Sequence, residues 1–580
     1  MAMQRTVPQG THDPVRHDVP MRRWTILAQD PGVLTSDGRA LTTTVAVAAE
    51  RLERGPKGHR IHVVDYDASA NVLYRPRTGD VASDPYADVT DIERLVGDPH
   101  FHQQNVYAIA MATLKEFECA LGRPVAWGFE HPGHQLKLAP HAFADANAYY
   151  SRESESLAFG YFPDRRGRIV YTCLSHDIVA HETTHALLDG LRPFYFQPSS
   201  PDQAAFHEGF ADVVALLSVF RSQTVVEHAL GPLTGRDGRV RFDRLDLDGL
   251  AGTALARLAE QMGAALDGVP SATLRASLRI EPAEFHYGSA RFEEAHDRGE
   301  LLVAIVLRAF VLTWLRRLEP LRADRVSGVS RSVVAEEGAT AAKQLLRIVI
   351  RAIDYLPPVD MSFPDYLSAL LTADLQLYPD DSRYHYRDIL RETFAAYGVV
   401  PSSGTRSDGA WDPPRVDSFT LAGTHFARMQ SDPTEVFRFV WENRKALGIE
   451  PNAFTRVISV RPVLRVSNDE TLLRETVVEY VQTLKIFANE LKALGIEKPA
   501  DMPGTQFITL YGGGSLVFGE YGQLKFHIGT GVASARQGDR LRSLWEQGHF
   551  ASSAPVAQRI AAMHRDRALR PFTPPAGRMW

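Results

Sequence analysis

The sequence contains only two cysteines, Cys119 and Cys173, among its 580 residues. So few thiols exclude a framework of several disulfides and favour a reducing compartment, although a single bridge between the two is still an alternative. Acidic residues slightly outnumber basic ones, which gives a net charge of −6 and a pI near 6.4. The protein therefore lacks the basic surplus typical of proteins that bind nucleic acids or anionic membranes, and we expect neither as a partner.

Long apolar runs are also lacking. The N-terminal residues contain no continuous apolar stretch of the kind that forms a secretory signal. The most apolar segment, residues 301–315, is shorter than a bilayer span and contains Arg308, so we expect a buried core helix there. These features predict a cytoplasmic protein, with export by a signal-independent route as the alternative.

A chain of this length is expected to form more than one domain. Residues 1–22 have the composition of a disordered terminus, whereas residues 23–100 alternate short apolar runs with Gly, Pro and Asp, which indicates strands and loops. Helical periodicity sets in near residue 103, in a segment expected to end at Gly122. Residues 147–162 have the pattern of two short strands, and helices are expected to dominate from 175 to about 400.

The clearest boundary in the chain is the Ser-, Gly- and Pro-rich segment 401–415, which predicts a linker. Beyond it, residues 416–580 mix two kinds of pattern. Residues 470–495 are expected to be helical, and residues 514–529 are expected to form strands. The sequence thus predicts a separate C-terminal α+β domain, for which no motif indicates a chemical role.

The segment SHDIVAHETTHALLDGL, residues 175–191, carries two histidines four residues apart in a helical apolar pattern. His181 and His185 therefore lie on one helical face, where both imidazoles can bind one metal ion. Glu182 points slightly aside, where its carboxylate can take a proton from a water on that ion. Taken alone, the same pattern also fits a helix that carries surface histidines.

A second apolar helix, AAFHEGFADVVALL, carries two acidic residues at the same spacing. Glu208 can supply the third ligand and leave the fourth position open for water, as a catalytic zinc site requires. Asp212, one turn later, can accept the free ring N–H of a ligand histidine and fix its tautomer. Either carboxylate alone fits an ordinary helix surface, but the two helices together predict one zinc ion per chain.

These two helices resemble those of the thermolysin-like gluzincin metallopeptidases, with the patterns D-x-V-x-H-E-x-x-H and E-x-x-x-D. The resemblance covers about residues 101–400. It implies a zincin fold, with a β-rich N-terminal lobe, a mainly α-helical C-terminal lobe and zinc in the cleft between them. Upstream, NAYY resembles the family's substrate-binding edge strand, so Asn147 and Ala148 would contact the substrate. An ordinary strand end at a turn is the alternative.

Further residues gain roles from the resemblance alone. His296, just before a long apolar helix, would donate a hydrogen bond to the oxyanion, and a solvent-facing histidine is the alternative. Tyr195 would assist the same oxyanion or serve only in packing. Arg275 and Arg298 are rival candidates for the arginine that binds the substrate carbonyl. The sequence departs from the family at Val219, where a calcium-binding glutamate is expected, so we predict no calcium site.

The sequence therefore predicts a zinc metalloendopeptidase that hydrolyses internal peptide bonds of a protein or peptide. Glu182 would assist the attack of a zinc-bound water and then protonate the leaving amine. His207, beside Glu208, is a weaker alternative ligand, since it is turned about 100° around the helix. Two other functions stay open. One is a catalytically silent scaffold, and the other is an effector protease with a single protein target. In the scaffold alternative residues 416–580 would carry the function. For this region, gating of the cleft, partner binding and substrate selection all stay open.

Overall fold

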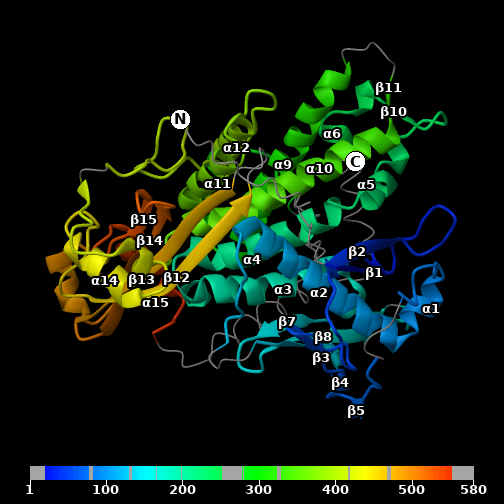
Figure 1. Ribbon diagram of the computed structural model, residues 1–580, viewed down its shortest axis with the longest axis horizontal. Helices are drawn as coiled ribbons and strands as arrows, with labels where there is room; N and C mark the ends of the chain where they lie inside the picture. Colours follow the sequence, from blue (N-terminus) through cyan, green and yellow to red (C-terminus); the bar gives the residue numbers. More distant parts are fainter. Residues whose placement is uncertain are drawn as a thin grey trace, which may run out of the picture.

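The computed structural model describes residues 20–77, 83–129, 134–164, 166–197, 199–250, 277, 280–322, 328–415, 418–466 and 472–550. It is a mixed α+β protein with small N-terminal sheets, a central helical region and a C-terminal antiparallel sheet (Figure 1). In Figure 1 the C-terminal strands lie at one end of the molecule and the first strands at the other, with helices between them. Residues 1–19, expected to be disordered, and the candidate Arg275 lie outside the described residues.

The N-terminal region consists of short strands, as the sequence predicted for residues 23–100. These strands and those that follow them are β1 (Met21–Leu27), β2 (Thr42–Ala48), β3 (Ile61–Val63), β4 (Tyr66–Asp67), β5 (Val72–Leu73), β6 (Leu136–Phe143), β7 (Ala148–Ser151), β8 (Ser156–Pro163) and β9 (Ile169–Tyr171). The largest of their sheets has the order β3-β6-β8-β7, and β9 also pairs with β8. Strands β7 and β8 are antiparallel, which confirms the two strands predicted within residues 147–162.

Helix α2 (Pro99–Leu121) packs against strands β3 and β6 of this sheet and against the helical region. It starts after Asp98, whose side chain accepts the backbone N–H of His100. It ends at Gly122, whose φ of 68° is a left-handed conformation that glycine adopts at little cost. The C-terminal end predicted for this helix is therefore confirmed.

Helices dominate the middle of the chain, as predicted. They are α1 (Ile92–Val96), α3 (His176–Leu191), α4 (Pro201–Phe220), α5 (Gln223–Ala229), α6 (Leu247–Gly249), α9 (Ala295–Leu318), α10 (Arg331–Arg351), α11 (Phe363–Leu377) and α12 (Tyr386–Ala395), with the short strands β10 (Arg239–Arg241) and β11 (Gly328–Ser330) between them. Helix α9 contains the apolar segment 301–315 and is buried along most of its length, as expected. Among the described helices none alone has the length and apolarity of a membrane span, and only α4 and α5 together, bent by 87°, pass that test.

The C-terminal region forms a four-stranded antiparallel sheet in the order β12-β13-β14-β15. Its elements are α13 (Phe426–Met429), α14 (Pro433–Glu442), β12 (Phe454–Val466), β13 (Leu472–Phe487), β14 (Phe507–Gly519), β15 (Leu524–Thr530) and α15 (Arg536–Glu546). The strands predicted within residues 514–529 are confirmed. The helix predicted over residues 470–495 is wrong, because residues 472–487 form the central strand β13. This segment is rich in β-branched side chains, and its middle residues are buried on both faces, which favours a strand.

Buried ion pairs connect the C-terminal sheet to the rest of the protein. Asp354, in the 3₁₀ helix η8 (Ala352–Tyr355), accepts two hydrogen bonds of 2.7 and 2.6 Å from Arg123, just beyond α2. The same carboxylate accepts a hydrogen bond from Arg465 of β12. Arg192, which ends α3, forms an ion pair with Glu479 of β13. Three parts of the chain that are distant in sequence are thus fixed together by buried charges.

The segment expected to be a linker, residues 401–415, runs along this body of the protein. The indole N–H of Trp411 donates to the carbonyl of Tyr355, and the Ser402 hydroxyl donates to Asp365. One continuous cluster of buried apolar side chains includes Trp24 near the start of the described chain and Ile528 in β15. The C-terminal sheet therefore shares a core with the helical region, and the domain boundaries stay a prediction.

Candidate metal centre

Helices α3 and α4 lie side by side and carry the residues of the predicted metal site. Helix α4 starts at Ser200, whose hydroxyl accepts the backbone N–H of Gln203, with Pro201 at the first helical position. Apart from Gly190, every residue of α3 is buried. The imidazoles of its first three turns therefore face protein and not solvent.

Three side chains converge between these helices. The Nε2 atoms of His181 and His185 are 2.9 Å apart. The carboxylate of Glu208 lies 3.8 Å from Nε2 of His181 and 3.7 Å from Nε2 of His185. All three are buried, and their ligand atoms lie within 4.8 Å of one another. The structure thus brings together the three residues that the sequence predicted as ligands.

The donor set and its spacing fit a zinc ion. Two nitrogens that each lie about 2.0–2.1 Å from a tetrahedral ion are about 3.3 Å apart. The separations among His181, His185 and Glu208 lie on both sides of that value. Two imidazoles and one carboxylate are also the ligands of catalytic zinc sites that keep one position open. The described residues therefore form a group that can hold a metal ion.

Asp212 takes the position predicted for it behind the first ligand. Its Oδ1 atom lies 2.9 Å from Nδ1 of His181. A carboxylate there accepts a hydrogen bond from Nδ1–H, so Nε2 carries the lone pair that faces Glu208 and His185. Burial lowers the pKa of His181, but Asp212, Glu182 and Glu208 together raise it above its ordinary value. Negative charge thus surrounds this imidazole, which favours a cation at the centre.

Glu182 is buried in the turn of α3 that carries the two histidines, next in sequence to His181. Its charge acts on His181 strongly enough to contribute to the raised pKa of that imidazole. It is not part of the ligand group, which consists of His181, His185 and Glu208. A carboxylate close to the ligands but outside their set is the arrangement that a general base needs.

His207 is packed against the site and does not belong to the ligand group. Its ring stacks on that of His185 at a centroid distance of 4.6 Å and an angle of 14°. Phe196 meets the His207 ring edge-on, at 4.5 Å. In this arrangement His207 packs between Phe196 and His185, and its role as an alternative ligand stays a prediction. The ring restrains the orientation of a ligand imidazole.

His296 lies in the first turn of α9, which crosses α4 beside the third ligand. The crossing is close because both helices have glycine there: a Cβ on Gly299 would lie 3.4 Å from the nitrogen of Gly209 and 3.6 Å from Cβ of Glu208. His296 is buried, and its Nδ1 lies 2.8 Å from Oε1 of Glu294. Its Nε2 is buried without a hydrogen-bond partner among the described residues.

The sequence did not indicate a role for Glu294. Its side chain accepts the backbone N–H of His296 and of Asp297, so it caps α9 at its N-terminus. The same carboxylate contacts the imidazole of His296 and fixes the ring. The signal that was available is the acidic residue two positions before the histidine, at the start of an apolar helical pattern.

Tyr195 and Arg298 are both engaged by other parts of the protein. The Tyr195 hydroxyl is buried and donates a 2.6 Å hydrogen bond to the carbonyl of Pro357. Arg298 is buried and bonds to Asp202 and, at 2.8 Å, to the carbonyl of Phe292. In this arrangement both side chains hold neighbouring elements together. A catalytic role for either would require these bonds to break.

The predicted substrate strand β7 is an edge strand of its sheet and lies beside α3. The Tyr150 hydroxyl of β7 donates a 2.8 Å hydrogen bond to Asp189 of α3, which fixes the strand to the helix. Ala148 pairs with Phe159 of β8. The side chain of Asn147 is buried and accepts the backbone N–H of Ala148 at 2.9 Å, so in this arrangement it caps the strand.

Comparison of the chain with models of known protein families and with curated proteins finds no match. The site is therefore defined by its own geometry. What the structure establishes is a buried His-His-Glu group, on two adjacent helices, that can bind a metal ion.

Proposed function

We propose that the protein is a zinc-dependent endopeptidase whose ion is held by His181, His185 and Glu208. The observation that carries this proposal is the convergence of these three side chains. A fourth buried group, Glu182, lies in the turn of α3 that also carries His181 and His185. Most structural zinc sites are closed by four protein ligands, and a carboxylate base beside the ligands serves no purpose in them. His181, His185 and Glu208 would supply three ligands here, and Glu182 would be the base.

Zinc bound here would polarise the scissile carbonyl and make a water molecule acidic enough to react near neutral pH. The protein's own residues account for the proton transfers. The Glu182 carboxylate accepts a proton as the water oxygen bonds to the carbonyl carbon. It then returns that proton to the amine nitrogen as the carbon–nitrogen bond breaks. Proton and electron counts balance, and the products are a carboxylic acid and an amine.

His296 is proposed to stabilise the negative charge that develops on the carbonyl oxygen. Glu294 accepts a hydrogen bond from Nδ1–H, so donation from Nε2 requires the ring to carry both protons. Support also comes from the tight crossing of α4 and α9, which keeps His296 one helical turn from the contact with Glu208. One such donor contributes roughly 3–4 kcal/mol to lowering the barrier.

We propose a protein or peptide chain as the substrate, bound in an extended conformation along β7. An edge strand offers unpaired backbone groups, and an extended peptide can add to it as a further strand. Strand β7 lies at the edge of its described sheet and next to α3. Backbone pairing is independent of the substrate's side chains, so this binding mode suits cleavage of internal peptide bonds.

The test is a comparison of wild-type protein with Glu182→Gln on a peptide library, with the zinc content of both measured. We expect Glu182→Gln to retain zinc and to lose roughly 100- to 10,000-fold in kcat, since it removes only the general base. Glu93→Gln, at an exposed helix position, is the matched control and should keep full activity. His185→Ala should lose the zinc as well as the activity.

Two results would contradict the proposal. If Glu182→Gln cleaved the library within a few-fold of the wild-type rate, the assigned base would be wrong. If the wild-type protein bound zinc but cleaved no member of the library and no folded protein, the silent scaffold would be the better description. Cleavage of one folded protein without cleavage of the library would identify an effector protease.

A further inference from the structure

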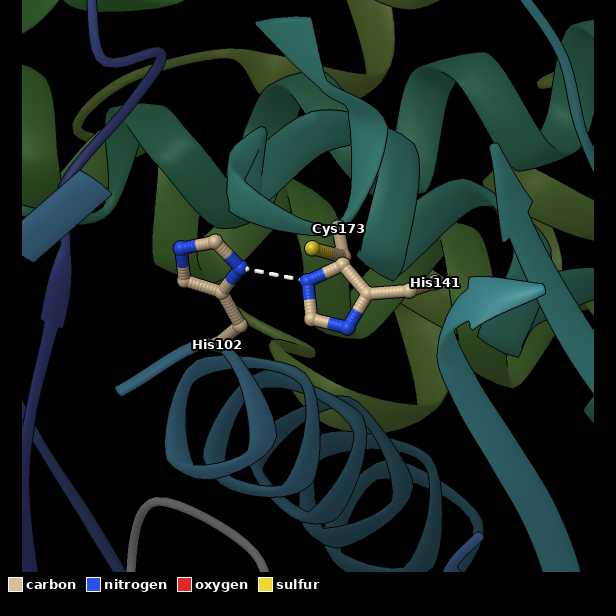
Figure 2. A group of neighbouring side chains, drawn as sticks. All are labelled: His102, His141 and Cys173. Carbon is tan, nitrogen blue, oxygen red and sulfur yellow. Dashed lines mark hydrogen bonds between the residues drawn. The ribbon is translucent and has the colours of Figure 1, made fainter. Parts of the chain in front are cut away.

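A second buried group of metal-binding side chains lies apart from the site on α3 and α4. It consists of His102 from α2, His141 from β6 and Cys173 from the 3₁₀ helix η1 (Thr172–Leu174) (Figure 2). Their ligand atoms lie within 4.8 Å of one another, and all three side chains are buried. Figure 2 shows the two imidazoles facing each other, with the sulfur of Cys173 beside the gap between them.

The outer ring nitrogens fix the tautomers of both histidines. Nε2 of His102 lies 2.9 Å from the carbonyl oxygen of Val96, which can only accept a proton. Nδ1 of His141 lies 2.8 Å from Oδ1 of Asp65, which also accepts. Each ring therefore carries its proton on the outer nitrogen and a lone pair on the inner one.

The two inner nitrogens, Nδ1 of His102 and Nε2 of His141, are only 2.7 Å apart. Two lone pairs at this distance repel each other unless a positive charge lies between them. That charge is either one extra proton shared by the pair or a metal ion. A shared proton has no need of a third donor, whereas a metal ion does, and the sulfur of Cys173 is placed to be that donor.

The surroundings of this group repeat those of the first metal centre. There Asp212 contacts the outer nitrogen of His181 at 2.9 Å, and here Asp65 contacts the outer nitrogen of His141 at 2.8 Å. Asp65 is itself held by Gln103, whose amide donates to it at 2.9 Å. Carboxylates that orient ligand imidazoles in this way are typical of metal sites.

Charge also favours a divalent cation. The sulfur of Cys173 is fully buried, where an unpaired negative charge is costly. A thiolate there requires a nearby positive charge. A divalent ion would be neutralised by one thiolate and the Asp65 carboxylate, so the group as a whole would carry no net charge.

Tyr171 and Tyr74 pack against the rings of His102 and His141, with centroids 4.7 and 4.5 Å away.

We propose that His102, His141 and Cys173 bind a second transition-metal ion of the zinc class, independent of the catalytic one. Two imidazoles and one thiolate are ligands that zinc accepts, with a water in the remaining tetrahedral position. The ion would connect α2, the sheet that contains β6, and the turn that leads directly into α3. Its role is to fix the start of the helix that carries His181 and His185.

Metal analysis of the purified full-length protein tests this proposal. We expect about two zinc equivalents per chain in the wild type, about one in Cys173→Ser and about one in His185→Ala. Cys119→Ser is the matched control, because Cys119 is the other cysteine and lies exposed. It should keep both equivalents. If the wild type held about one zinc equivalent and His185→Ala held none, the proposal would be overturned. The two histidines would then be held together by a shared proton.

Substitution with Co²⁺ gives a second readout that does not depend on a stable variant. A cysteine thiolate bound to Co²⁺ produces a ligand-to-metal charge-transfer absorption, which imidazoles and carboxylates do not. The ligands of the first site, His181, His185 and Glu208, contain no sulfur. We therefore expect this absorption in cobalt-loaded wild type, Cys119→Ser and His185→Ala. Its absence from cobalt-loaded wild type would show that Cys173 binds no metal.

Discussion

Replacing Asp212 with asparagine would test how the first metal centre is held in its binding geometry. Asp212 lies 2.9 Å from Nδ1 of His181, and its negative charge keeps the proton on that nitrogen. Asparagine has nearly the same shape but no charge, and its amide group can donate as well as accept. The variant therefore allows His181 to place its proton on Nε2, where it blocks the lone pair that binds the metal.

The expected loss of zinc affinity follows from what a carboxylate such as Asp212 does for a ligand histidine. Removing a carboxylate that orients a ligand imidazole weakens metal binding by about 10- to 100-fold. Since tenfold in affinity corresponds to about 1.4 kcal/mol, the expected loss is roughly 1.4–2.7 kcal/mol. Both Asp212 and His181 are buried, so solvent does not screen the interaction strongly. We therefore expect the loss of zinc-binding free energy to lie in this range. An exposed ion pair, by contrast, contributes almost nothing.

The assay is competition for zinc between the protein and a chelator of known affinity, with Cys173→Ser as the background so that only the first site is titrated. Asp243→Asn, an exposed carboxylate in an ion pair with Arg241, is the matched control and should leave zinc affinity unchanged. A zinc affinity of Asp212→Asn within twofold of the background protein would refute the reasoning. It would mean that Asp212 does not set the tautomer of His181.

Two further predictions concern stability. Asp354→Asn should lower the free energy of unfolding by about 3–5 kcal/mol in urea titrations, because it leaves the buried guanidiniums of Arg123 and Arg465 without their carboxylate; a loss below about 1 kcal/mol would contradict this. Burial, reinforced by the Arg221 guanidinium, lowers the pKa of His176 to about 4. The unfolded chain takes up that proton near pH 6.5 and the folded one only near pH 4, so this histidine should remove roughly 3 kcal/mol of stability as the pH falls between the two. His176→Gln should lose less stability than wild type over that interval, and equal losses would refute the assignment.

The candidate metal site could be predicted because its residues recur at helical spacing. His181 and His185 are four residues apart, as are Glu208 and Asp212, and that spacing places each pair on one face of a helix. The packing of α3 against α4 could not be derived from spacing. It depends on side chains along the whole of both helices, and here the sequence supplied only a resemblance.

The second group could not be predicted, since its members share no local pattern. His102 and His141 are 39 residues apart and belong to a helix and a strand, and Cys173 follows in a third element. Only tertiary packing brings them together. The sequence showed one of two cysteines and two of 21 histidines, for which a buried structural role and a metal-binding role give the same pattern.

Strand β13 shows a different limit. Residues 472–487 have apolar side chains on both faces of the strand, so the alternation that marks a half-buried strand is lost. Apolar residues interrupted at irregular intervals, here by Glu475, Glu479 and Gln482, do not separate a strand from a buried helix by periodicity alone. Composition held the better signal, since Thr476, Val477, Val478 and Val481 are β-branched. Their place between β12 and β14 is what fixes them as a central strand.

The position of β13 also connects the C-terminal region to the candidate metal site on α3. Helix α3 is held at its C-terminal end by the buried pair of Arg192 with Glu479 of β13, and the proposed second metal at Cys173 would hold its N-terminal end. His181 and His185 lie between these two anchors. Imidazoles that must place two nitrogens within a few tenths of an ångström of a metal geometry need a helix that does not shift. If α3 carries the metal ligands as we propose, the C-terminal sheet has a physical reason to pack against it, because the pair of Arg192 and Glu479 restrains that helix.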